Sequence, residues 1–266
     1  MVKNKHIRIF VTFVAFALII YAADEYKDYR VGQIKHEAYA EIIPLIGLSD
    51  DDDFFTTVDK IRLFLFENSV YSDGEDFHKI WGQHTLIAKH IIASADGTAG
   101  KRAPLECSSR SGVLESILIT LGYKVRSIAV YAYGENYNSH TFTEVQDPKT
   151  GKWHTQDVQF NIYWKMKETG ERASIYELVQ HDVSNYIPCR TPDQCHWDLP
   201  NREGSFAKNM PEKFGLASIK DYQRGKRPLV VNTKRFDLNT PQKVGEQSLT
   251  YCDWIPKNCR EEITKF

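Results

Sequence analysis

The chain of 266 residues lacks a dominant charge, because 34 lysines and arginines stand against 35 aspartates and glutamates, a formal net charge of −1. Acidic and basic residues alternate along most of the sequence, and no basic stripe of the kind that contacts nucleic-acid phosphates occurs. We therefore expect no nucleic-acid partner. The sequence also has no internal repeat, no low-complexity tract and no motif for ATP, a nucleotide or a redox group. We expect no cofactor and no metal.

Cysteine is scarce, and its five copies leave one thiol over if the others pair. Cys189 and Cys195 are six residues apart in the last third of the chain, and Cys252 and Cys259 are seven apart. Two disulfides and a free Cys107 fit an oxidising compartment. The four C-terminal cysteines allow three disulfide connectivities, and the sequence does not choose among them. A zinc site built from the four is the alternative, although about two to four intervening residues are usual there.

One long uncharged run occurs near the N-terminus, fifteen residues from Ile9 to Ala23, after the basic segment 1–8. As a helix it would be about 22 Å long, short of the roughly 30 Å hydrocarbon core unless flanking side chains snorkel. We favour an uncleaved signal anchor over residues 1–23, with the basic end in the cytoplasm. A cleaved signal peptide and secretion is the alternative, but Tyr21 puts a large residue where cleavage prefers a small one.

Four successive aspartates, Asp50 to Asp53, end the expected linker and juxtamembrane helix over 24–53. They lack the spaced ligands and the distant glutamate of a calcium loop. We interpret them as a charged N-terminal cap for a helix that begins near Phe54.

Two segments with apolar residues at helical spacing, from Phe54 and from Phe77, are predicted to pack around a core. The second includes Trp81 among its core positions. His78, His84 and His90 invite a metal interpretation, but a six-residue spacing does not keep them on one helical face, so we favour solvated or edge histidines.

The most informative stretch runs from Leu105 to Trp164 and opens with a cysteine-bearing helix. Apolar residues recur at helical spacing from Ser109, and Gly122 follows where a left-handed cap is expected. Pro104 suits a chain that enters a helix, which puts Cys107 at or just before the first turn. Unpaired backbone N–H groups and the helix dipole favour a thiolate there.

Three strand-like segments follow this helix. They are, in order, Val125 to Tyr133, His140 to Gln146 and Lys152 to Val158, with a turn at 147–151 between the last two. If Gln146 pairs with Gly151 across a four-residue loop, His140 lies directly opposite Asp157. A slip of one residue would put these two side chains on opposite faces.

Cys107, His140 and Asp157 then have the complementary chemistry of a thiol acyl-transfer site. A thiolate attacks an amide carbonyl, an imidazole moves protons, and a carboxylate fixes the tautomer and stabilises the imidazolium. The backbone N–H of Cys107 is a candidate oxyanion donor, which we favour over Gln83. A buried cysteine or a strand histidine alone is commonly structural, so the hypothesis depends on the combination.

The segment resembles the transglutaminase-like superfamily of papain-type folds. Its members share a cysteine at a helix start, a strand that opens with histidine in an H-x-x-x-E-V pattern, and an aspartate after a tryptophan-containing strand. Here these are Cys107, His140 in HTFTEV, Trp153 and Asp157. The resemblance covers about residues 54–165 and implies an α+β fold in which helices, including the nucleophile helix, pack on a short antiparallel sheet. It also implies catalysis on an amide of a peptide or protein through a thioester.

We therefore predict four parts: an anchor (1–23), a linker and juxtamembrane helix (24–53), a catalytic core (54–165) and an irregular, disulfide-stapled C-terminal extension (166–266). The expected function is a cysteine amidase, protease or transamidase attached to the cell membrane, with its catalytic part extracytoplasmic. The alternative is a catalytically silent module that binds a peptide in envelope or surface-polysaccharide assembly. The segment 157–164, with the sequence DVQFNIYW, resembles that of envelope-associated bacterial members of the superfamily.

Overall fold

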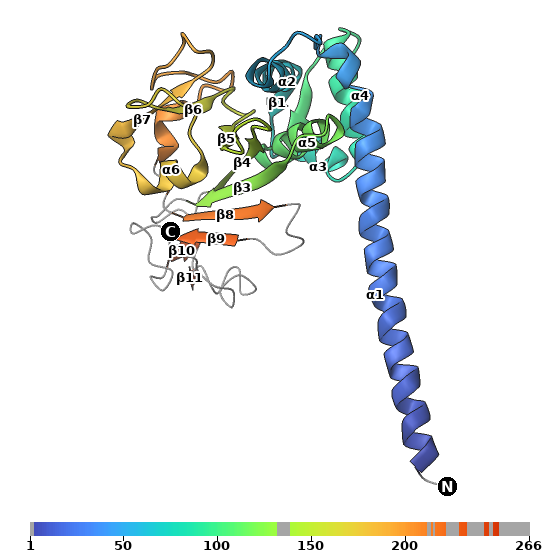
Figure 1. Cartoon of the computed structure of the whole chain (residues 1–266). Coiled ribbons are helices and arrows are strands. Elements are labelled where there is room, and N and C mark those ends of the chain that lie inside the picture. Colours follow the sequence, from blue (N-terminus) through green and yellow to red (C-terminus); the bar gives the residue numbers. More distant parts are fainter. Residues whose placement is uncertain are drawn as a thin grey trace.

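The computed structural model describes residues 3–131, 139–211, 214, 216–221, 229–232, 242–244 and 247–249. It is a mixed α and β protein with small sheets, which agrees with the predicted α+β class. Figure 1 shows a body of helices and sheets from which one long helix projects.

Helices form mainly in the first half of the described chain. They are α1 (Lys3–Ala40), α2 (Phe54–Asn68), α3 (Glu75–Ile80), α4 (His84–Ala95), α5 (Cys107–Thr120) and α6 (Ile175–Gln180), with short 3₁₀ turns at Ile43–Leu45, Val183–Asn185 and Ala207–Asn209.

The main sheet has five strands in the order β5-β4-β3-β8-β9, with antiparallel neighbours throughout. These strands are β3 (Val125–Tyr131), β4 (Ser139–Gln146), β5 (Trp153–Gln156), β8 (Leu216–Asp221) and β9 (Leu229–Asn232). Three two-stranded sheets accompany it, formed by β1 (Ser69–Tyr71) with β2 (Ala103–Leu105), β6 (Tyr163–Met166) with β7 (Tyr186–Cys189), and β10 (Gln242–Val244) with β11 (Gln247–Leu249). The C-terminal extension is thus more regular than predicted, because it supplies β8 and β9 to the main sheet.

Two hydrophobic cores lie on the two faces of this sheet. Val125 and Val145 belong to the core shared with α2, α4, α5 and the end of α1. Ile128 and Phe142 belong to the other core, which includes β6, α6 and Phe214. The alternation of side chains along β3 and β4 produces this division, and it fixes α5 against one face of the sheet.

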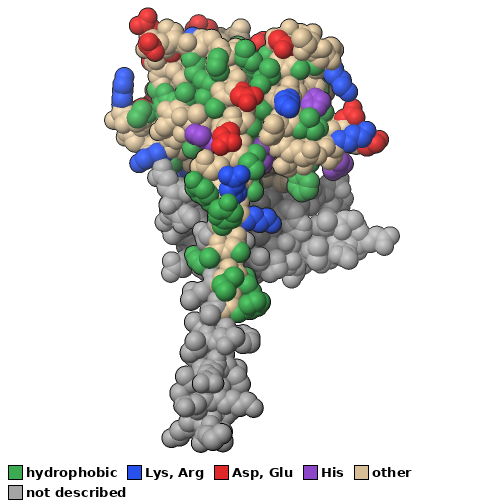
Figure 2. All heavy atoms as spheres, turned by 90° about the vertical axis from the view of Figure 1, so that its right-hand side faces the viewer, with side chains coloured by type: hydrophobic (Ala, Val, Ile, Leu, Met, Phe, Trp, Pro, Cys, Tyr) green, Lys and Arg blue, Asp and Glu red, His purple; other side chains and the backbone are tan. Residues whose placement is uncertain are grey.

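The C-terminal part of α1 packs on the body, whereas the rest extends away from it (Figure 1). Ala38 and Tyr39 are buried against the first core. Toward the N-terminus of the helix, Phe16, Ile19 and Tyr26 are 62%, 65% and 65% exposed. Figure 2 shows hydrophobic side chains along this projecting part. Among the described residues, no helix combines the length and apolar character needed to cross a membrane. The anchor expected over 1–23, where most side chains fall outside the described residues, stays a prediction.

The cap predicted before Phe54 is confirmed. Asp53 is the N-cap of α2, and its Oδ1 accepts a hydrogen bond from Thr56 N at 2.7 Å. A carboxylate here satisfies one of the backbone donors that begin the helix and complements its dipole.

The single helix expected from Phe77 is wrong, because the chain forms two helices with a break between them. Gly82 adopts a left-handed φ of 74°, which ends α3 and reorients the chain before α4 begins at His84. Trp81, expected in the core, lies at this break and is 64% exposed.

A disulfide joins Cys189 and Cys195. This bond excludes the zinc alternative for that pair, because zinc binds free thiolates. Cys252 and Cys259 lie outside the described residues, so their pairing stays a prediction.

Candidate active site

Cys107 is the first residue of α5, as the sequence predicts. The side chain of the N-cap residue, Glu106, accepts no hydrogen bond from the helix backbone, so the first-turn N–H groups keep their capacity to stabilise a negative charge. The helix ends in a Schellman motif: Tyr123 N bonds Leu118 O, Gly122 N bonds Ile119 O, both at 2.9 Å, and Gly122 has a φ of 85°.

The hairpin that connects β4 and β5 differs from the predicted one by two residues. Gln146 pairs with Trp153, not with Gly151. Asp147 holds the wider loop, because its Oδ1 and Oδ2 accept hydrogen bonds from Lys149 N and Thr150 Oγ1, both at 2.8 Å. A shift of two residues keeps every side chain on the same face of the hairpin. The prediction that His140 and Asp157 share a face is therefore confirmed, whereas the prediction that they lie directly opposite each other is wrong.

His140 and Asp157 meet across this hairpin. His140 Nε2 donates to Asp157 Oδ2 at 2.7 Å, and both side chains are buried, at 3% and 1% exposure. The other carboxylate oxygen, Oδ1, accepts from Gln159 N at 2.9 Å and from Phe160 N at 3.3 Å. Asn161, with a φ of 52°, completes the tight turn that presents the carboxylate.

The Cys107 thiol lies close enough to the His140 imidazole for each group to shift the pKa of the other. Because Nε2 is engaged by Asp157, Nδ1 is the ring nitrogen left to exchange a proton with the sulfur. The backbone N–H of Thr141 also contributes to the lowered pKa of the thiol. The structure therefore brings all three predicted residues together, with Cys107 beside His140 and His140 hydrogen-bonded to Asp157.

The electrostatics of this chain favour a thiolate–imidazolium pair. Burial opposes ionisation of Cys107, but the hydrogen bond and charge of His140 and the Thr141 N–H outweigh it, so the pKa of the thiol is lowered. Burial also opposes the imidazolium, yet the charge and hydrogen bond of Asp157, with a contribution from Cys107, raise the pKa of His140 to about 9. Between these two pKa values the sulfur is negative and the ring positive.

The nucleophile is the accessible member of the three. Cys107 is partly exposed, whereas the His140 ring is covered by Phe160, edge-on at a centroid distance of 5.5 Å, and by Phe142 at 6.1 Å. Tyr71, which is 36% exposed, lies near enough for Cys107 to contribute to the raised pKa of its phenol, whose main cause is burial. A carbonyl group can thus approach the sulfur while apolar side chains shield the proton-transfer pair.

A buried ion pair that was not predicted from the sequence lies beside the site. Arg110, one helical turn after Cys107 and 1% exposed, bonds Glu203 at 3.0 Å and Gln159 O at 3.4 Å. Glu203 also accepts from Tyr71 N at 2.9 Å. Arg110 therefore ties the nucleophile helix to the turn that holds Asp157 and to the C-terminal extension. Its partner is 93 residues away in the chain, and no local pattern signals the pairing.

Glu144, the glutamate of the HTFTEV motif, has a structural role. It is fully buried, its Oε2 accepts from Arg126 Nε at 2.5 Å, and its Oε1 accepts from Ile175 N at 2.5 Å. These bonds attach the start of α6 to β4. Burial raises the pKa of Glu144, and Arg126 acts in the opposite direction.

Gln83 and the three early histidines do not join the triad. The Gln83 side chain donates to Lys79 O at 2.8 Å and lines a recess beside α1. His78 is exposed, and His84 and His90 are partly exposed, which confirms solvated or edge positions. Within the described part of the chain, no three candidate metal ligands gather.

No protein-family model matches this chain, and no curated protein matches it.

Proposed function

We propose that this protein is a cysteine enzyme, similar to the transglutaminase-like superfamily, that cleaves or transfers an amide of a peptide or protein. One observation carries the proposal: Cys107, at the partly exposed start of a helix, interacts with His140, which is hydrogen-bonded to the buried Asp157. A thiolate, an imidazolium and a carboxylate in this order are the groups required for acyl transfer.

In the first half-reaction the Cys107 thiolate attacks the amide carbonyl carbon and a C–S bond forms. The carbonyl oxygen takes up the negative charge, which the N–H of Cys107 at the uncapped helix start stabilises. His140 gives its Nδ1 proton to the amide nitrogen, the C–N bond breaks and the amine leaves. A thioester to Cys107 remains.

In the second half-reaction water or an amine attacks the thioester, and neutral His140 takes the proton of the attacking group. The C–S bond breaks, the product leaves as an acid or a new amide, and the thiolate–imidazolium pair is restored. Asp157 stays ionised and holds the imidazole ring in place throughout. Water as acceptor makes the enzyme an amidase or protease, and an amine makes it a transamidase.

The proposal includes a place in the cell envelope, with residues 1–23 as a membrane anchor and the catalytic part outside the cytoplasm. The Cys189–Cys195 disulfide supports this location, because structural disulfides persist in oxidising compartments. Protease digestion of intact cells tests it: an extracytoplasmic body is degraded, and a cytoplasmic one is protected.

The decisive experiment is the rate of iodoacetamide labelling of Cys107 against pH in the full chain, beside His140→Ala. We expect labelling near pH 6.5 to be at least about tenfold faster in the wild-type protein, because His140 lowers the pKa of its thiol and so raises the ionised fraction. Cys107→Ser is the control for labelling elsewhere. An ordinary thiol pKa near 8.5, indifferent to His140→Ala, would sink the enzyme proposal and favour the catalytically silent module.

If the thiol is activated, a fluorescent primary amine distinguishes the two acceptors. Incubation with a mixed protein substrate gives amine-labelled protein if the thioester reacts with amines. New peptide termini or released ammonia show that it reacts with water. Neither product should form with Cys107→Ser.

A further inference from the structure

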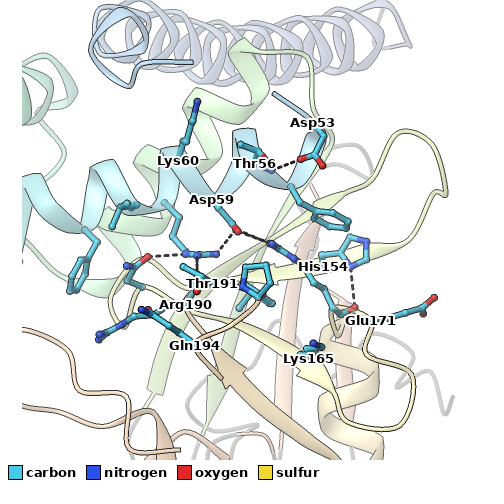
Figure 3. A pocket seen from close by; sticks show the side chains of 18 of the residues that line it. Asp53, Thr56, Asp59, Lys60, His154, Lys165, Glu171, Arg190, Thr191 and Gln194 are labelled. Carbon is cyan, nitrogen blue, oxygen red and sulfur yellow. Dashed lines mark hydrogen bonds and ion pairs between the residues drawn. The ribbon is translucent and has the colours of Figure 1, made fainter. Parts of the chain in front are cut away.

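A cleft of about 1100 Å³ lies beside the candidate active site (Figure 3). Its walls come from α2, the turn after β5, β6 and the chain around the Cys189–Cys195 disulfide. Asn161 in its lining belongs to the turn that holds Asp157, but Cys107, His140 and Asp157 are not among the lining residues. The cleft is therefore separate from the proposed catalytic groups, and the turn that contains Asn161 lies between them.

One carboxylate serves two arginines at this cleft. Asp59 bonds Arg62 Nη1 at 2.8 Å and both terminal nitrogens of Arg172 at 2.7 Å, as Figure 3 shows around the labelled Asp59. Arg62 is 1% exposed, and burial, with the charge of Arg172, lowers its pKa. Among the described residues no second acid bonds either guanidinium. Neutral acceptors, Asn161 Oδ1, Gln156 Oε1 and Arg190 O, take the other Arg62 donors. Two guanidinium groups thus share one directly bonded carboxylate in a poorly solvated place, and this excess of positive charge favours an approaching anion.

Further cations line the cleft without an acidic partner. Neither Lys165, on β6, nor Arg190, next to the disulfide, makes an ion pair with a described acid, and Figure 3 shows both side chains at the cleft with Gln194. Arg190 Nε and Asn201 Nδ2 are buried donors with no hydrogen-bond acceptor. A bound group that accepts hydrogen bonds and carries negative charge would satisfy these side chains.

The acids of the lining are already engaged. Glu171 bonds Lys152 at 2.7 Å, Asp147 is occupied by its own turn, and Asp53 caps α2. These carboxylates lie among the cations of the lining, so the surface is not a continuous basic stripe and does not suit a nucleic acid. The cap on α2 also occupies the helix N-terminus at which a phosphate would otherwise bind.

We propose that this cleft binds an acidic segment of a peptide or protein. Its volume of about 1100 Å³ is slightly above the roughly 300 to 1,000 Å³ of small-molecule sites, so an extended ligand fits it. The cations of the cleft stand singly, with carboxylates that already have partners between them, so carboxylates spaced along a peptide can pair with them one by one. The side-chain amides of Gln194 and Asn201 can hydrogen-bond to the backbone of such a peptide. Binding requires no thiol chemistry, so this proposal and the proposed function can fail separately.

The test is fluorescence anisotropy with a short fluorescein-labelled peptide of alternating glutamate and serine. The protein is the full chain with Cys107→Ser, which prevents processing of the probe. We expect binding that weakens with salt, and a Kd at least about tenfold higher with Lys165→Glu, because a like charge then faces the ligand. Lys165→Gln removes the charge without reversing it and should raise the Kd by a smaller factor. This graded response distinguishes an electrostatic effect on binding from a folding defect. Lys124→Glu, an exposed lysine outside the cleft, is the matched control and should bind as before.

Two comparisons decide the ligand class. A peptide with glutamine in place of glutamate should bind much more weakly, and a uronic-acid oligosaccharide of equal charge should compete less well than the glutamate peptide. Equal binding of the glutamine peptide, or a Kd unchanged by Lys165→Glu, would overturn the site. Stronger competition by the oligosaccharide would overturn the peptide as its ligand.

Discussion

His140 and Asp157 hydrogen-bond at 2.7 Å although the strand register does not set them opposite each other. The pairing of Gln146 with Trp153, continued along both strands, would place Asp157 across from Phe142. The aspartate is therefore offset by two residues along the strand from the position opposite His140, on the same face of the hairpin. The turn that follows Gln156 orients its carboxylate toward the imidazole ring. Loss of the carboxylate alone should therefore change the chemistry of His140 while the hairpin remains intact.

Asp157→Asn should narrow the pH range in which the thiolate–imidazolium pair exists. Burial lowers the pKa of His140, but Asp157, with a smaller contribution from Cys107, raises it to about 9, so neutralisation of Asp157 lets that pKa fall toward the ordinary value near 6.5. The pair exists above the thiol pKa and below the histidine pKa, so the alkaline limit moves down. NMR titration of the His140 ring, beside Cys107 alkylation, measures both groups.

The matched control is Asp50→Asn, an exposed carboxylate away from the hairpin, which should leave both titrations unchanged. A His140 pKa that stays near 9 in Asp157→Asn would show that another group supports the imidazolium.

Arg110 and Glu203 should show strong energetic coupling. Arg110→Met leaves Glu203, whose side chain is 15% exposed, without its counter-ion, and breaking a buried pair from one side costs about 3 to 5 kcal/mol. Arg110→Met combined with Glu203→Gln should recover part of this loss, with a coupling of roughly 1 to 3 kcal/mol. Chemical unfolding of the wild-type protein, the two single variants and the double variant completes this double-mutant cycle. Additive effects of the two single substitutions would contradict the coupling.

Local chemistry explains which parts of the fold could be predicted. Asp53 before Phe54 and Gly122 after the helix are capping signals that act within a few residues, and both formed as expected. The hairpin register was missed because the side chain of Asp147 widens its own loop. Hydrophobic periodicity also failed at Gly82, where a left-handed backbone outweighs the helical pattern on either side.

The surroundings of the triad could not be predicted because they depend on contacts between distant segments. Glu203 reaches Arg110 across 93 residues, and Arg62 reaches Asn161 across 99. The order of Cys107, His140 and Asp157 was visible in the sequence because each residue has a characteristic place on a helix or strand. The ion pairs that hold those elements together have no such signature.

Asp53→Ala should lower the free energy of unfolding by about 1 kcal/mol, the usual cost of a lost N-cap. Its 2.7 Å bond to Thr56 N is the contact removed. That bond also lowers the pKa of Asp53, so the stabilising effect is present above its unfolded pKa of about 3.9 and is lost as pH falls through the folded value. Urea titrations at neutral pH and near pH 3 measure both effects. Asp50→Ala is the control, and an equal loss from it would attribute the effect to general charge instead of the cap.

Replacement of Cys189 and Cys195 by serine should destabilise the protein by about 2 kcal/mol, because the bond closes a short loop of the unfolded chain. The loop also holds the carbonyl of Arg190, which accepts from Arg62 Nη2 at 2.8 Å, so a looser loop weakens the anchoring of that buried guanidinium. A reductant should lower the unfolding midpoint of the wild-type protein by a similar amount. Mass spectrometry of alkylated peptides shows whether the pair is reduced in each sample. An unchanged midpoint in a sample with both thiols labelled would mean that packing, and not the disulfide, holds this segment.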